Sequence, residues 1–213
     1  MCESHEQLVS LGFTEQLFPA GTHICQIFND DEERDRSLSQ FLASGIADGE
    51  HVSCYTCSHN TASITSNLSA LGISMQECID AGQLVMMNTE EAYFSDNEFN
   101  PERMLDFMSN HWKNSLSSGY SKVRVIGEMS PTIQCIKGGD RLTEYECRIT
   151  IMLRDNKITC ICQYDARKFD GATIMDILLV HPMMIVRGQV VQNPFFVPPE
   201  EFLEKLKRQQ AAV

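Results

Sequence analysis

The feature that most constrains the fold of this chain is a regular alternation between short β-rich runs and longer helical stretches. Turn or capping residues separate the two kinds of segment along most of the chain. Because helices of about ten residues or more join the strands, the connections are crossovers, so the strands run mostly parallel and helices cover both faces of the sheet. The sequence therefore predicts an α/β fold with a mostly parallel sheet. The predicted strands are residues 23–28, 51–57, 83–88, 122–128 and 157–164.

The end of the chain departs from this alternation. Residues 183–186 and 189–191 flank an Arg-Gly turn and predict a closing hairpin. A Pro-Pro pair then introduces an amphipathic helix over about residues 198–209. Earlier in the chain, residues 90–100 form an acidic and aromatic segment that we expect to be a loop.

The composition is that of one packed globular domain, with 43% hydrophobic and 22% charged residues among 213. We expect a single domain over residues 1–213, with its core at about 21–196. A formal net charge of −12 would repel a phosphate backbone, which disfavours direct nucleic-acid binding. The first residues lack the pattern of a signal peptide, and no apolar run approaches the ~18 residues of a membrane span. These features predict a cytoplasmic protein that makes no membrane contact.

A nucleotide hydrolase built on such a sheet would carry the phosphate-binding loop G-x-x-x-x-G-K-[ST] after a strand. Its glycines let main-chain amides surround the phosphates, and its lysine reaches the outer ones. Residues 57–63, after the second predicted strand, read CSHNTAS and contain neither glycine nor lysine. We therefore expect no enzymatic activity, and a degenerate nucleotide-binding domain stays open as an alternative.

Several short strings occur in a fixed order along the chain: GTHICQIFND at 21–30, GEMS at 127–130, EYE at 144–146, CQYD at 162–165 followed by Arg167 and Phe169, HP at 181–182 and NPFF at 193–196. Together they resemble the MEDS family, the methanogen/methylotroph, DcmR-type sensory domain. That resemblance implies a RecA/KaiC-like fold without a phosphate-binding loop, and a role in sensing small hydrocarbon derivatives such as halogenated or methylated one-carbon compounds. Family members usually join this domain to a helix-turn-helix, a histidine kinase or another signalling module. None is visible here, so the resemblance implies a signalling partner in trans, and self-association stays open.

Ligands of open α/β sheets bind outside the carboxyl ends of the strands, which fixes where a candidate site lies. Methionines and aromatic residues available there, together with the acidic net charge, favour a small and largely apolar ligand. We predict no catalytic residues, no bound metal and no cofactor. The predicted ligand-binding residues are Ser58, Thr89, Glu128, Met129, Tyr164 and Asp165.

Nine cysteines, several of them inside apolar runs, indicate reduced thiols and keep a redox sensor open as a further alternative. The two pairs, Cys54 with Cys57 and Cys160 with Cys162, would together supply four thiolates for a metal if their strands were neighbours. Cys54 and Cys57 lie three apart on a strand and point to opposite faces, which favours a packed core role. By the same reasoning His23, at the start of a strand, and His181, at the end of a helix, are interpreted as structural histidines.

Overall fold

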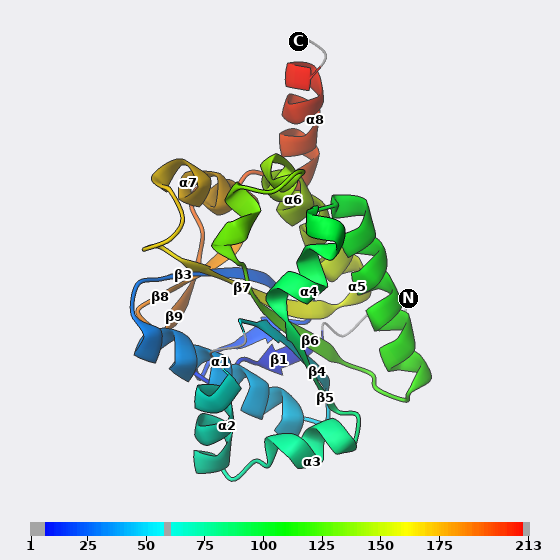
Figure 1. Ribbon diagram of the computed structural model, residues 1–213. Helices are drawn as coiled ribbons and strands as arrows, with labels where there is room; N and C mark the ends of the chain where they lie inside the picture. Colours follow the sequence, from blue (N-terminus) through cyan, green and yellow to red (C-terminus); the bar gives the residue numbers. More distant parts are fainter. Residues whose placement is uncertain (1–6, 58–60, 211–213) are drawn as a thin grey trace.

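The centre of the molecule is a seven-stranded sheet with helices on both faces (Figure 1). The computed structural model describes residues 7–57 and 61–210. The strands are β3 (His23–Phe28), β4 (His51–Thr56), β5 (Leu84–Asn88), β6 (Val123–Glu128), β7 (Ile158–Asp165), β8 (Met183–Val186) and β9 (Gln189–Gln192). They lie in the order β5-β4-β6-β7-β3-β8-β9, and each neighbouring pair is parallel except β8 with β9. The predicted α/β class and the closing hairpin are confirmed.

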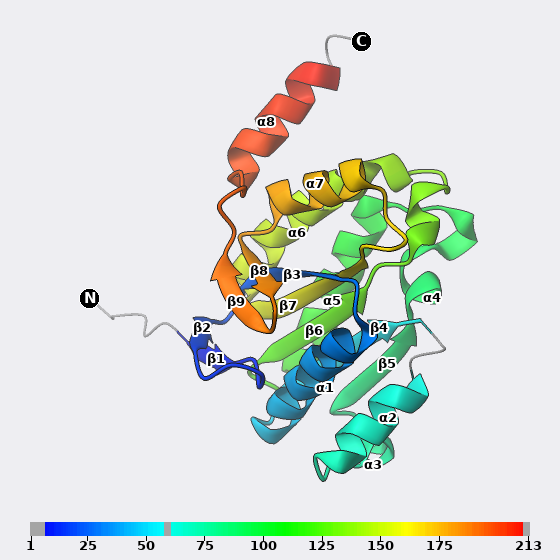
Figure 2. The same cartoon turned by 90° about the vertical axis from the view of Figure 1, so that its left-hand side faces the viewer.

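Two groups of helices enclose the sheet. One face is covered by α1 (Asp31–Ala47), α2 (Thr61–Ala70) and α3 (Met75–Asp80), and the other by α4 (Thr89–Tyr93), α5 (Pro101–Ser117), α6 (Leu142–Asn156) and α7 (Gly171–Val180) (Figure 1). The last helix, α8 (Pro199–Gln210), projects from the body of the molecule (Figure 2). None of the helices in the described part of the chain is long and apolar enough to cross a membrane.

Capping side chains begin several of the helices. The carboxylate of Asp30 accepts hydrogen bonds from the main-chain N–H groups that open α1, and Ser74 does the same for α3. Asn100 caps α5, and Pro101 occupies its first turn, where a missing N–H costs nothing. These local interactions fix where the three helices start.

Two short elements differ from the sequence-based expectation. Residues 90–100, expected to be a loop, contain α4 and a 3-10 turn at Ser95–Asn97. The side chain of Asn88 caps α4, and burial of Tyr93 and Phe94 holds it against the sheet. A separate two-stranded antiparallel sheet, β1 (Leu8–Ser10) with β2 (Leu17–Pro19), was also not predicted. Both elements are too short for periodicity to reveal, so tertiary packing decides them.

The sheet separates two hydrophobic cores because side chains alternate between its faces along each strand. On the α1 side, Ile24, Cys54 and Ile161 pack against Phe41. On the α6 side lies a second core, which collects Cys25, Tyr55, Val125, Cys160, Cys162, Tyr164, Tyr145 and Ile149. Residues at odd positions of β3 and even positions of β7 therefore share the α6 face.

A buried ion pair ties β6 to the start of β4. The Arg124 guanidinium binds both carboxylate oxygens of Glu50, with both N–O distances at 2.7 Å, and donates to the main-chain oxygen of Phe41. Both charged side chains are fully buried. A Cβ atom at Gly45 would overlap Cδ and Nε of Arg124, so glycine lets α1 approach this guanidinium closely.

Candidate functional site

At the carboxyl edge of the sheet, the structure brings together two of the predicted residues, Glu128 and Thr89. Glu128 ends β6, is 4% exposed, and accepts a 3.1 Å hydrogen bond from the hydroxyl of Thr56. A guanidinium nitrogen of Arg34 lies 3.5 Å from its carboxylate. The Thr89 hydroxyl donates to the main-chain oxygen of Glu128 at 2.9 Å. Glu128 and Thr89 therefore already form hydrogen bonds and an ion-pair contact within the protein.

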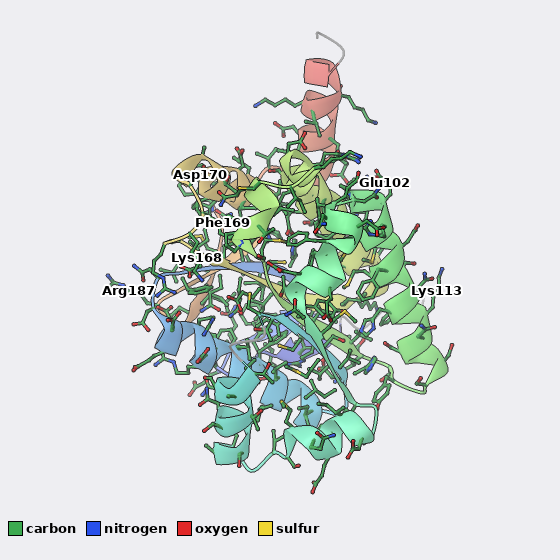
Figure 3. All side chains as sticks on the ribbon, in the orientation of Figure 1. Glu102, Lys113, Lys168, Phe169, Asp170 and Arg187 are labelled. Carbon is green, nitrogen blue, oxygen red and sulfur yellow. The ribbon has the colours of Figure 1, made fainter. Side chains whose placement is uncertain are left out.

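The aspartate at the end of β7 is also engaged. Asp165 accepts from Nε of Arg167 at 2.7 Å and from its Nη2 at 2.9 Å. The hydrogen bond from Arg167 lowers the pKa of Asp165 to about 2. The same guanidinium binds Asp31 at the head of α1. Lys168 lies on the connection from β7 to α7 beside this ion-pair group (Figure 3).

The remaining predicted residues do not join Glu128 in one open site. Met129 is 4% exposed, and Tyr164 is fully buried, edge-on to Phe169 with ring centroids 5.4 Å apart. Ser58 lies outside the described residues. A cavity of about 150 Å³ does open at this edge, and its lining residues are Thr56, Thr61, Met86, Met87 and Asn88. Ligand binding by the predicted set stays a prediction.

A second group of functional side chains lies inside the α6 core. His23, Glu146, Cys162 and His181 are all buried, and one potential metal-ligating atom of each lies within 4.8 Å of all the others. Oε2 of Glu146 is 3.4 Å from Nε2 of His23 and 3.5 Å from Nε2 of His181. Sγ of Cys162 is 3.2 Å from Nε2 of His23 and 3.7 Å from Oε2 of Glu146. We call these four residues the His-Glu-Cys cluster.

Different elements deliver the four side chains. His23 begins β3, Cys162 lies in the middle of β7, Glu146 lies on α6, and His181 follows the last residue of α7. Strands β3 and β7 are parallel neighbours, with His23 opposite Cys160 in the register. The alternation of faces therefore directs His23 and Cys162 to the same side of the sheet, toward α6.

Hydrogen bonds outside the cluster set the tautomers of both imidazoles. The Thr150 hydroxyl donates its one hydrogen to the main-chain oxygen of Glu146 at 2.9 Å. The hydroxyl oxygen therefore accepts the hydrogen bond from Nδ1 of His23, at 2.8 Å. Nδ1 of His181 donates to the main-chain oxygen of Ile177 at 2.8 Å. A neutral imidazole that donates through Nδ1 has its lone pair on Nε2. Both Nε2 atoms thus present a lone pair to the cluster.

Burial keeps the imidazoles neutral. It lowers the pKa of His23 and that of His181 to about 3. Burial also raises the pKa of Glu146. A hydrogen bond with Cys160, whose Sγ lies 3.8 Å away, and burial together raise the pKa of Cys162. The hydroxyl of Tyr164 donates to the other carboxylate oxygen of Glu146 at 2.6 Å, which fixes the orientation of that carboxylate.

The cysteine pairs considered from the sequence do not converge. Strand β6 separates β4, which carries Cys54, from β7, which carries Cys160 and Cys162, so these strands are not neighbours. Cys54 packs in the α1 core, whereas Cys160 and Cys162 pack in the α6 core. The structure therefore does not bring the thiols of these two pairs together around one metal position.

A mostly apolar cavity of about 510 Å³ opens at the amino edge of the sheet, where β3 and β8 begin. His23 and Thr150, which belong to the cluster and its support, form part of its wall. We call this space the amino-edge cavity. Its apolar lining residues are Leu17, Phe18, Pro19, Pro182, Met183, Phe196, Pro198 and Pro199. It lies at the opposite edge of the sheet from Glu128.

Sequence reasoning interpreted the two histidines as structural residues, considered Cys162 only together with other cysteines, and did not consider Glu146 as a site residue. The available signal was the set of ordered strings, because each string from β3, α6, β7 and the end of α7 contains one cluster residue. Their sequence separation, from residue 23 to residue 181, hid the fact that they meet.

Comparison with solved structures identifies the fold. The chain is similar to a KaiC-like protein from the hyperthermophilic archaeon Pyrococcus horikoshii OT3, with a TM-score of 0.60 and 14% sequence identity. The similarity covers 84% of this chain and 79% of that one. The molecule therefore has the KaiC-like α/β fold.

The sequence gives the family. The pattern that defines MEDS, the MEthanogen/methylotroph, DcmR Sensory domain, matches residues 22–182, a range that includes the whole His-Glu-Cys cluster. This chain belongs to the MEDS family. It is also 26% identical over 160 residues to the transcriptional repressor DcmR of Methylorubrum extorquens (strain DSM 6343 / CIP 106787 / DM4). That match spans 75% of this chain and 57% of the length of the repressor.

Proposed function

We propose that this chain senses a small, largely apolar molecule in the amino-edge cavity and signals its presence to a partner protein. Membership of a sensory family supports the general role, and the relationship to a transcriptional repressor supports regulation as the output. The observation that carries the proposal is the cavity itself. Its volume of about 510 Å³ lies in the range of small-molecule sites, and a few polar groups interrupt an apolar wall.

The polar groups of that wall would orient a ligand. Thr150 and Arg154 reach it from α6, and Glu200 reaches it from the first turn of α8. The volume exceeds that of a single one-carbon compound, so the cavity suits several such molecules or one larger apolar molecule. Halogenated or methylated one-carbon compounds, which the family resemblance suggests, are therefore one arm of the test.

The position of the cavity suggests how occupancy would be transmitted. Its wall joins the body of the domain to residues Phe196–Glu200, which lead into α8. That helix projects from the body (Figure 2) and exposes charged residues along much of its length. A ligand that bridges the wall would shift the balance of positions available to α8, because it binds one arrangement better than the others. The partner would be a histidine kinase or a transcription regulator.

We further propose that the domain does not hydrolyse nucleotides. Residues 57–63 carry no glycine or lysine, and the turn from β3 into α1 is acidic, with Asp30, Asp31, Glu32 and Glu33. Carboxylates at a helix start already occupy the amides and the positive end of the dipole that a phosphate would use. A degenerate nucleotide binder is thus the weaker alternative.

Methionine methyl groups report on the two edges of the sheet separately. Met183 lines the amino-edge cavity, whereas Met86 and Met87 line the cavity at the carboxyl edge. The experiment is a titration of the protein, labelled at its methionine methyls, with dichloromethane, methanol or toluene, followed by NMR. We expect saturable shifts of the Met183 signal, with toluene binding more tightly than either one-carbon probe because it buries more apolar surface.

Two matched variants test the assignment. Leu17→Trp should fill the amino-edge cavity and abolish the shifts of the Met183 signal, whereas Met87→Trp should leave them intact, with circular dichroism confirming that both variants fold. Shifts confined to Met86 and Met87 would instead favour the carboxyl-edge site predicted around Glu128. If none of the three probes moves any methionine signal, an apolar ligand is the wrong class.

A further inference from the structure

We propose that His23, Glu146, Cys162 and His181 form a binding site for one divalent transition-metal ion, with zinc as the best fit. The proposal rests on the geometry of the His-Glu-Cys cluster and does not depend on what occupies the amino-edge cavity. Two imidazoles, one carboxylate and one thiolate are ligand types that zinc accepts in four-coordinate sites.

The spacing of the ligand atoms matches the edges of a coordination tetrahedron. Zinc–ligand bonds of about 2.0–2.3 Å place neighbouring ligand atoms about 3.3–3.6 Å apart. The distances from Glu146 Oε2 to the two Nε2 atoms are 3.4 and 3.5 Å, and the distances from Cys162 Sγ to His23 and Glu146 are 3.2 and 3.7 Å. The widest separation within the set does not exceed 4.8 Å, so an ion would need to draw the farthest pair together by up to about 1.5 Å.

The lone pairs are directed inward before any ion arrives. Nδ1 of His23 is held by Thr150, and Nδ1 of His181 is held by the oxygen of Ile177, which leaves both Nε2 atoms as acceptors. A hydrogen bond from the outer nitrogen of a ligating imidazole to a main-chain or side-chain oxygen is the usual support of a metal-bound histidine. Tyr164 gives the same support to the carboxylate of Glu146.

A buried acceptor without a donor is the second, independent sign of a missing ligand. Nε2 of His181 is buried and has no hydrogen-bond partner among the described residues. A buried polar atom left unpaired loses its hydrogen bonds to water without replacement, so native proteins rarely keep one without a reason. A cation between this nitrogen and Glu146 would satisfy it, together with the lone pairs of His23 and Cys162.

The charges of the cluster suit a doubly charged ion in an apolar core. A thiolate and a carboxylate carry two negative charges, which balance a dication, and the two imidazoles stay neutral. The bound site would therefore have no net charge, which is what burial requires. Binding would release the thiol proton of Cys162 and any proton on Glu146 to solvent.

A bound ion would join four elements that are distant in sequence. The ligands come from β3, α6, β7 and the end of α7, so coordination would hold both helices on the sheet. His23 and Thr150 also face the amino-edge cavity, which places the ion directly behind its wall. We therefore expect metal binding to stabilise the domain and to fix the inner wall of that cavity.

The test measures metal in the full chain along two routes. In the first, protein produced in zinc-supplemented medium is desalted and its metal content is measured by inductively coupled plasma mass spectrometry. In the second, the protein is unfolded with a chelator and refolded with Zn²⁺, with Co²⁺ or without metal. We expect about one ion per chain, a higher melting temperature with metal, and a thiolate-to-cobalt charge-transfer band in the near ultraviolet.

Variants inside and outside the cluster identify the ligands. His181→Ala and Cys162→Ser should each lower zinc affinity at least tenfold, and Cys162→Ser should also remove the charge-transfer band. Cys54→Ser, which changes a buried cysteine in the α1 core, and His51→Gln, which changes a histidine at the start of β4, should keep one ion per chain. These controls separate loss of ligation from general damage to the fold.

Two results would overturn the proposal. One is wild-type protein that folds to the same circular dichroism spectrum along both routes while binding less than a tenth of an equivalent of zinc or cobalt. The other is a metal content that stays unchanged in folded His181→Ala and Cys162→Ser. Should either variant fail to fold, the cobalt spectrum of the wild-type protein decides, because a complex without the thiolate band excludes Cys162 as a ligand.

Discussion

The hydroxyl of Tyr164 donates a 2.6 Å hydrogen bond to Oε1 of Glu146, and both side chains are buried. Tyr164→Phe removes the donor and leaves a buried carboxyl oxygen without it, which should cost about 1–3 kcal/mol of unfolding free energy. Urea denaturation measures this loss. Tyr120→Phe removes a more exposed hydroxyl, which bonds the main-chain oxygen of Gly82, and should cost less than about 0.5 kcal/mol. Equal losses in the two variants would mean that the buried hydrogen bond to Glu146 contributes no more to the unfolding free energy than the more exposed one to Gly82.

Purified protein should turn over ATP and GTP no faster than a blank without protein. The reason is the absence of glycine and lysine in residues 57–63 and the acidic turn that opens α1. A phosphate-release assay across successive purification fractions measures it. Turnover that follows the protein through purification and disappears in Glu128→Gln would contradict this prediction, since Glu128 ends β6 at the carboxyl edge of the sheet.

The ion pair of Arg124 with Glu50 should show strong coupling in a double-mutant cycle. Arg124→Met leaves the Glu50 carboxylate buried and unpaired, so we expect a loss of about 3–5 kcal/mol of unfolding free energy. Adding Glu50→Leu removes the stranded charge and should restore much of that loss. Denaturant unfolding of the four proteins gives the coupling energy. Additive effects of the two substitutions would show that the pair is not coupled.

His111 should make the stability of the domain depend on pH. Burial, with the nearby His51 as a smaller cause, lowers the pKa of His111 to about 4 in the folded state, below its ordinary value of 6.5. Between about pH 4 and 6.5, His111 is therefore protonated in the unfolded chain and neutral in the native state. This contribution to stability is therefore complete above about pH 6.5 and is lost as the pH falls toward 4, by at most about 1.4 kcal/mol per pH unit.

The comparison with His111→Gln isolates that contribution from those of other titrating groups. The difference in unfolding free energy between the wild type and the variant should be constant above about pH 6.5 and should shrink steadily between about pH 6.5 and 4. Chemical denaturation at a series of pH values measures it. A difference that stays constant over the whole range would show that His111 has the same pKa in both states.

The sequence by itself determined the layout of this protein. Alternating β-rich and helical segments fix a parallel sheet because short strands joined by helices have few other ways to bury their apolar faces. Capping residues such as Asp30 and Asn100 marked helix starts, since a cap acts within three residues of its own position. The strings that resemble the MEDS family also lie in the sequence, and the family match confirmed them.

Only the tertiary structure decided the chemistry of the interior. His23 and His181 stand far apart along the chain, yet their ring centroids lie 4.1 Å apart. They meet because β3 pairs with β8, where Ile24 lies opposite Met183, and His181 precedes Met183 by two residues. Whether an imidazole nitrogen offers a proton or a lone pair depends on its neighbours, here Thr150 and the oxygen of Ile177. Strand order, register and helix packing set those neighbours, and each is a long-range property that no local pattern of residues encodes.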